Sequence, residues 1–93
     1  MEREYTENIM RVELLGLARE RAGVAELELQ AHTLGELLTA LAARFPSLGE
    51  LITVNRLQPS VVANLNGDHF VSDPLTQLSE GDSVLILSAD AGG

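Results

Sequence analysis

The residues of this chain that most clearly could take part in chemistry are the two glycines at its C-terminal end, Gly92 and Gly93. They follow Ser88-Ala89-Asp90-Ala91, and this short stretch follows the apolar run from Val84 to Leu87. Because glycine has no Cβ, two in succession can pass through a channel too narrow for other residues. Such a tail can deliver its terminal carboxylate into another enzyme. Small terminal residues are also common without any function, so the rest of the chain must show whether this pair is functional.

A tail of this kind needs a folded body, and the sequence predicts one from Met10 onward. Apolar and polar residues alternate from Met10 to Leu14 and again from Ala25 to Leu29, which is typical of half-buried strands. A polar turn at residues 19–23 separates them. We therefore expect a hairpin, preceded by a polar N-terminal extension at residues 1–9.

The middle of the chain carries a strong helix signal. Thr33 and Glu36 form a capping-box pattern, which satisfies two otherwise unpaired amides at a helix start. An apolar stripe with spacings of three and four follows, made of Leu34, Leu37, Leu38, Leu41, Ala42 and Phe45. Pro46 ends the helix. A second, short helix is predicted where residues 47–50 repeat the capping-box pattern, and residues 55–60 are predicted as a loop.

The last third of the chain predicts three more strands. Val61 to Leu65 precede Asn66-Gly67, a strong hairpin-turn signal, with His69 to Val71 as the return strand. Val84 to Leu87 are apolar on both faces, which is expected of a strand at the centre of a sheet. The order predicts an α+β fold with one main helix across one face of a mixed sheet, and with the first and last strands adjacent.

Composition limits the class of function. The 93 residues suffice for one domain, and the formal net charge of −8 argues against a nucleic-acid partner. Absence of cysteine excludes disulfides, thiolate metal sites and a cysteine nucleophile. Neither a signal peptide nor a run of 18 uncharged apolar residues occurs, so we expect a cytoplasmic protein without a membrane partner.

In this order, these features resemble the MoaD/ThiS family of ubiquitin-like sulfur carriers, which includes the small subunit of molybdopterin synthase. The resemblance runs from Met10 to Gly93. It is carried by the opening hairpin, the helix capped at Thr33, the strand and turn at residues 61–67, the approach to the last strand at residues 78–84, and Gly92-Gly93. It implies a β-grasp sheet of four to five strands, a domain at residues 10–87 and a flexible tail at residues 88–93.

The resemblance also implies a chemistry for the tail. In that family an ATP-using enzyme similar to ubiquitin-activating enzymes adenylates the final carboxylate, and a sulfur donor protein then converts it to a thiocarboxylate. Gly93 would carry the reacting group, and Gly92 would let it enter the activating site. ATP and Mg²⁺ would be bound by the partner, and this chain would hold no cofactor or metal. By itself it would be a carrier with little turnover.

The resemblance leaves the pathway open. The second helical segment after Pro46 is similar to the molybdopterin synthase small subunit, which would insert its tail into the large subunit. That subfamily usually has aromatic residues and prolines near the end, whereas this chain has Leu85 to Ala91 there. The alternatives are carriers for thiamine, cysteine or tRNA thiolation, a ubiquitin-like protein modifier, and a plain binding module with an inert tail.

Two other groups of residues have the types, but not the spacing, of chemical sites. Asp68, His69, Ser72 and Asp73 contain the members of a hydrolase triad, yet neighbours in a hairpin alternate faces and no nucleophile elbow accompanies Ser72. A solvated turn is the better interpretation. His32 has no second histidine or cysteine at i+4, which disfavours a metal site.

Overall fold

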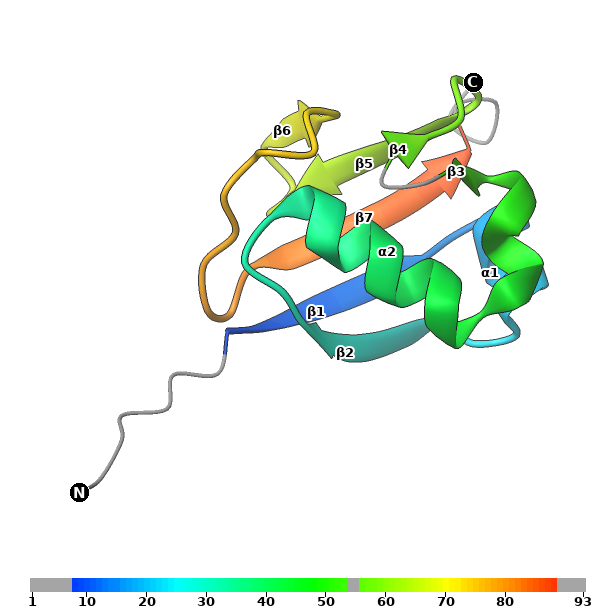
Figure 1. Cartoon of the computed structure of the whole chain (residues 1–93), viewed down its shortest axis with the longest axis horizontal. Helices are drawn as coiled ribbons and strands as arrows, with labels where there is room; N and C mark the ends of the chain where they lie inside the picture. The colour runs from blue at the N-terminus through cyan, green and yellow to red at the C-terminus, as the bar shows by residue number, and fades with distance from the viewer. Residues whose placement is uncertain (1–7, 54–55, 89–93) are drawn as a thin grey trace.

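The computed structural model describes residues 8–53 and 56–88, and in it α2 lies across one face of a sheet (Figure 1). The elements in chain order are β1 (Ile9–Leu14), α1 (Leu17–Ala22), β2 (Glu26–Gln30), α2 (Leu34–Arg44), a 3₁₀ helix (Pro46–Glu50), β3 (Ile52–Thr53), β4 (Arg56–Leu57), β5 (Val61–Leu65), β6 (His69–Val71) and β7 (Ser83–Ser88). The predicted α+β class is confirmed.

The main sheet has five strands in the order β2-β1-β7-β5-β6. β1 and β7 are parallel neighbours, and the other pairs are antiparallel. The expectation that the first and last strands lie side by side in the centre is therefore confirmed. Both faces of β7 carry apolar residues. Val84 and Ile86 are buried in the core, and Leu85 and Leu87, on the other face, are half-buried between the side chains of the neighbouring strands.

The connection between β1 and β2 differs from the predicted polar turn. It contains the helix α1, which ends at Gly23 with a left-handed φ of 81°. Ala18 of α1 is buried against the core. Only Ala18 and the partly buried Ala22 of α1 pack against the core, and two small residues in so short a helix are too weak a pattern to predict it from the sequence.

The main helix forms as predicted, from Leu34 to Arg44. The Glu36 backbone N–H donates to Thr33 Oγ1 at 3.2 Å, and the His32 backbone N–H donates to Glu36 Oε1 at 2.8 Å. Four leucines of the stripe are buried, and its last two members are partly buried against the same core. Each fully buried leucine contributes about 1.5–3 kcal/mol of transfer free energy, so this stripe fixes α2 on the sheet.

The region after α2 confirms one prediction in outline and corrects another. A second, short helical segment follows α2 as predicted, and it is a 3₁₀ helix that begins at Pro46 and ends at Glu50. Within the predicted loop, Arg56 and Leu57 form β4, which pairs with Thr53 and Ile52 of β3. A strand of two residues is too short to show a period, so alternation could not reveal it.

The described fold includes two residues before Met10. β1 starts at Ile9, and the buried Asn8 side chain donates from Nδ2 to the carbonyl oxygens of Ala31, at 3.0 Å, and Leu78, at 2.8 Å. Asn8 thereby joins the start of β1 to two distant segments. No helix of the described ranges is long and apolar enough to cross a membrane.

The predicted hairpin at residues 61–71 is confirmed. Asn66 and Gly67 have φ values of 55° and 75°, and they are the central residues of a turn in which the Asp68 backbone N–H donates to the Leu65 carbonyl oxygen at 3.0 Å. Asn66 also holds the approach to β7, because its Oδ1 accepts from the Ser83 backbone N–H at 2.8 Å and its Nδ2 donates to Asp82 Oδ1 at 3.0 Å.

Candidate functional site

The predicted site residues Gly92 and Gly93 lie outside the described residues, as does the stretch at residues 89–91. What the structure describes is the base from which they extend. Ser88, the last residue of β7, lies opposite Val61 of β5. On the other side of β7, the Leu15 backbone N–H donates to the Ile86 carbonyl oxygen at 2.9 Å. The base of the tail is thus held on both sides.

One face of the sheet points away from α2, and we call it the open face. It has two halves of different character. Strand alternation places on it Val62 and Asn64 of β5, Phe70 of β6, and Leu85 and Leu87 of β7. Phe70 is 70% exposed, and the other four are half-buried. The half of the open face nearest the tail is therefore mainly apolar.

The other half of the open face is charged. The register places Arg11 and Glu13 of β1 beside Glu28 and Glu26 of β2. Arg11 and Glu26 form an ion pair at 3.3 Å, with side chains 56% and 49% exposed, so it contributes at most about 1 kcal/mol. The remaining carboxylates make this half acidic. An apolar patch with an acidic border suits a partner surface that is apolar at its centre and basic at its rim.

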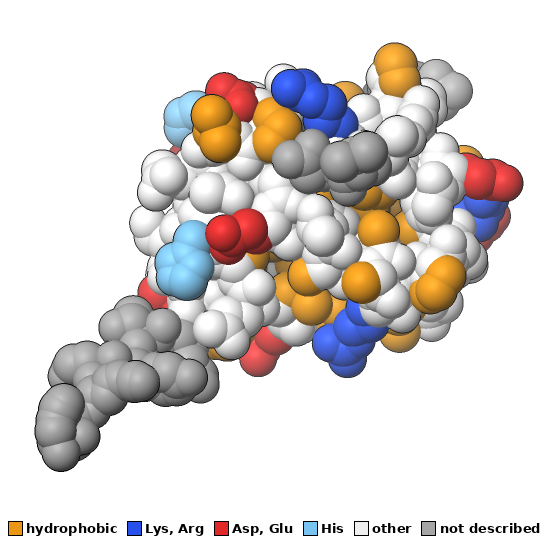
Figure 2. Space-filling model, viewed as in Figure 1, with side chains coloured by type: hydrophobic (Ala, Val, Ile, Leu, Met, Phe, Trp, Pro, Cys, Tyr) orange, Lys and Arg blue, Asp and Glu red, His pale blue; other side chains and the backbone are white. Residues whose placement is uncertain are grey.

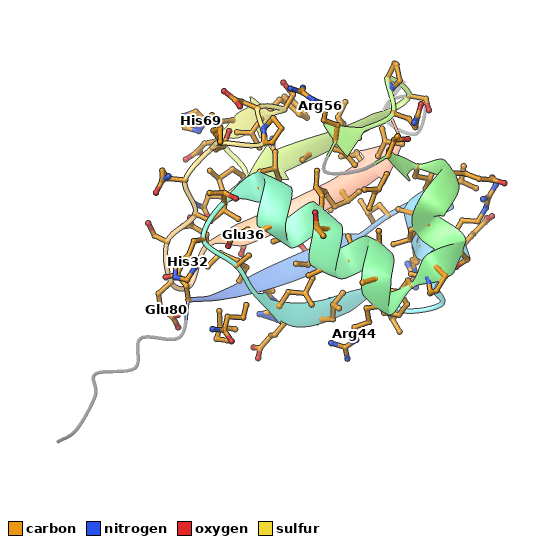
Figure 3. The ribbon with its side chains drawn as sticks, viewed as in Figure 1. His32, Glu36, Arg44, Arg56, His69 and Glu80 are labelled. Atoms are coloured by element: carbon orange, nitrogen blue, oxygen red, sulfur yellow. The ribbon has the colours of Figure 1, made fainter. Side chains whose placement is uncertain are left out.

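Two further features border the base of the tail. Leu15, directly after β1, and Leu17, the first residue of α1, are 42% and 37% exposed. On the side of β5, a hollow of about 310 Å³ is lined by Arg56, Leu57, Gln58, Pro59, Val61, Val62, Phe70, Val71 and Ser72. Figure 3 shows Arg56 on β4, on the same side of the molecule as β5 and β6. Apolar surface therefore continues around the point where the tail begins.

A second hollow, of about 410 Å³, lies on the side of the sheet that carries α2, which is the side seen in Figure 2. Its lining includes Ala40 and Ala43 of α2 together with Leu75, which is 76% exposed. This hollow lies across the sheet from Leu85 and Leu87, so a partner docked on the open face would not fill it.

The other sequence candidates do not form a site. Figure 3 shows His69 on β6 and His32 before α2 at separate positions. His32 Nδ1 lies 3.6 Å from Glu36 Oε1, and Asp73 Oδ1 accepts from the Leu75 backbone N–H at 2.9 Å, so Asp73 shapes a turn. Among residues 8–53 and 56–88, no three His, Cys, Asp or Glu side chains lie close enough together to hold a metal ion.

Sequence reasoning missed the exposed residues around the tail. Leu15 and Leu17 lie outside the alternating pattern, and their exposure follows from the unpredicted helix α1. Phe70 could have been singled out, because the chain has only two phenylalanines and this one alternates onto the face opposite the core. An exposed aromatic side chain in a chain so poor in aromatics indicates an interface.

Several solved structures share this fold. Small archaeal modifier protein 1 from Methanosarcina acetivorans matches with a TM-score of 0.76 and 24% identity, over 96% of this chain and 100% of that one. The CysO chain of the Amycolatopsis orientalis BexX/CysO complex matches with a TM-score of 0.75 and 22% identity, over 90% of this chain and 99% of that one. A chain of the complex of molybdopterin-converting factor subunits 1 and 2 from Helicobacter pylori matches with a TM-score of 0.61 and 22% identity, over 86% of this chain and 92% of that one.

No curated protein matches the sequence. The model of the ThiS family, however, matches residues 12–93, which run from the middle of β1 through β5, β6 and β7 to both terminal glycines. This chain therefore belongs to the ThiS family, and with it to the ubiquitin-like sulfur carriers that its sequence resembles.

Proposed function

We propose that this chain carries sulfur on the carboxylate of Gly93. A carboxylate oxygen attacks the α-phosphorus of ATP, pyrophosphate leaves, and an acyl adenylate forms. A sulfur donor then attacks the acyl carbon, and AMP leaves with the electron pair of the broken bond. The adenylate is needed because the charge of a free carboxylate repels nucleophiles. ATP and Mg²⁺ are bound by the adenylating enzyme, and this chain supplies the acyl group.

The position of Ser88, the last described residue before the tail, is the observation that carries the proposal. Only five residues follow Ser88, so a fully extended tail reaches about 17 Å from the end of β7. An enzyme that holds Gly93 in its active site must therefore also contact the folded body. The apolar half of the open face, with Leu85 and Leu87 on the tail's own strand, lies within that reach.

We further propose that the chain is the small subunit of molybdopterin synthase, and that the large subunit receives the tail. The likeness to the Helicobacter pylori complex supports this assignment, as does the helical segment at Pro46–Glu50. In that role the same apolar surface contacts the adenylating enzyme and the large subunit in turn. Carriers for thiamine, cysteine or tRNA thiolation would use the same surface with other acceptors.

A second function, protein modification, is favoured by the likeness to small archaeal modifier protein 1. A modifier would join Gly93 to lysines through an amide. Because all six basic residues of this chain are arginines, the lysine of such a branch would come from another protein.

Mass spectrometry of the protein recovered from its own cells tests the proposal. A carrier gives a terminal peptide in which sulfur replaces one oxygen of Gly93, and this replacement is lost when the adenylating enzyme is deleted. Branched peptides that end in Gly92-Gly93 on lysines of other proteins, without the sulfur form, would establish the modifier instead. Co-purification with a large synthase subunit would support the molybdopterin assignment.

A further inference from the structure

One polar side chain in the open face has no hydrogen-bonding role inside the described fold. Asn64 of β5 lies directly opposite Leu85 of β7 on one side and Phe70 of β6 on the other. Val62 lies two residues earlier on the same face. The Oδ1 atom of Asn64 is buried and has no hydrogen-bond partner among the described residues. A polar atom in this state loses its hydration without compensation, so it weakens the fold.

Rotation of the amide does not remove this cost. Half a turn about the last side-chain bond exchanges Oδ1 with Nδ2, so a polar atom occupies the buried position in either orientation. A leucine is similar in size and would fill the place among Val62, Leu85 and Phe70 without an unpaired atom. Asn64 therefore lowers the stability of the isolated domain. It also places a polar group inside an apolar patch, which a leucine would not do.

We propose that Asn64 sets the partner specificity of the open face by accepting a hydrogen bond from an N–H or O–H group of the adenylating enzyme. This inference rests on the proposed function and adds the residue that selects the enzyme. Docking removes water from the apolar side chains around the amide. A partner with a donor at this position pairs Oδ1, whereas one without it leaves the amide unpaired in a dry interface and binds less well.

The geometry places Asn64 where such an enzyme must dock. Its neighbour Leu85 precedes Ser88 by three residues, which is about 10 Å along a strand. That distance is shorter than the reach of the tail, so an enzyme that holds Gly93 can cover Asn64. Phe70 lies opposite Asn64 on β6 and is 70% exposed, so its ring has room to change rotamer when a partner docks beside Asn64.

The test is ATP–pyrophosphate exchange, measured with the adenylating enzyme from the same cells at increasing concentrations of wild-type chain, Asn64→Leu and Asn64→Asp. We expect Asn64→Leu to raise KM about tenfold with kcat unchanged, because a hydrogen bond is lost from docking while Gly93 is untouched. Asn64→Asp keeps the acceptor and should retain a KM close to that of the wild type. The melting temperature of Asn64→Leu should rise by about 4 °C.

Gln30→Leu is the matched control. It replaces an amide by leucine on the same face, on β2, three strands away from β5, and should leave KM unchanged. Normal exchange by the wild type with an unchanged or lower KM for Asn64→Leu overturns this inference alone. A rise in KM for Asn64→Asp equal to that for Asn64→Leu also overturns it, since the partner would then not use the oxygen acceptor. Failure of the wild-type chain to support exchange overturns the proposed function, and this inference with it.

Discussion

Val61, the first residue of β5, lies directly opposite Ser88, the last residue of β7. The strand that carries the tail is therefore paired up to its final residue, and the five residues that follow extend from a fixed point. Under the proposed function, a short tether on this fixed point would lower the entropy lost when the adenylating enzyme positions the carboxylate of Gly93.

We predict that Gly93→Ala slows adenylation about 100-fold, because an added methyl group displaces the carboxylate within the active site of the adenylating enzyme. The melting temperature should stay that of the wild type. ATP–pyrophosphate exchange and thermal unfolding measure the two effects. Ala91→Ser, a change of similar size two residues earlier, is the control and should have a small effect. Normal activation of Gly93→Ala would refute the role given to this residue.

The open face gives a second prediction. Leu87→Ala should weaken binding of the adenylating enzyme about tenfold, because it removes apolar contact area beside the base of the tail. Leu75→Ala makes the same substitution on the α2 side, where Leu75 is 76% exposed, and should leave affinity unchanged. Isothermal titration calorimetry of both variants separates the two surfaces. Equal losses in affinity would contradict the assignment of the open face.

A third prediction concerns the core. Leu41 of α2 is fully buried, so Leu41→Ala should lower the free energy of unfolding by about 2–5 kcal/mol, from lost transfer free energy and the cavity left behind. Urea unfolding followed by circular dichroism measures this loss. The exposed Leu75→Ala should change stability by less than about 0.5 kcal/mol. A small loss for Leu41→Ala would mean that α2 does not depend on its apolar stripe.

The turn between β5 and β6 gives a fourth prediction. A Cβ added at Gly67 meets no atom within 4 Å, yet its φ is 75°. Gly67→Ala should therefore cost about 1–2 kcal/mol through backbone conformation alone. A Cβ at Gly49 also meets nothing within 4 Å, and its φ is not in the left-handed region. Gly49→Ala should thus be close to neutral in the same urea experiment, and a comparable loss there would contradict the explanation.

Several parts of the fold could be predicted because each has a local pattern with one physical cause. The stripe from Leu34 to Leu41 follows the helical period, and Asn66-Gly67 has the chemistry of a tight turn. The central position of β7 follows from apolar residues on both of its faces. In each case the local sequence and the tertiary structure favour the same conformation.

Other parts depend on contacts between residues far apart in the sequence. The burial of Ala18, a residue of α1, and the pairing of β3 with β4 have no local period to reveal them. The unpaired Oδ1 of Asn64 is likewise visible only when β5, β6 and β7 are assembled. The terminal glycines could be recognised from the sequence, whereas the surface beside them could not, because exposure is a property of the packed sheet.

The parallel pairing of β1 with β7 joins the two ends of the described chain, with Val12 opposite Val84. During synthesis on a ribosome, the centre of the sheet stays open until its last strand emerges, and contacts of such large sequence separation form late. Residues 89–93 are made after β7, so under the proposed function a new chain would acquire its reacting group and its closed sheet almost together. A copy truncated before β7 would lack Leu85 and Leu87 of the open face as well as the tail, and the adenylating enzyme would not use ATP on it.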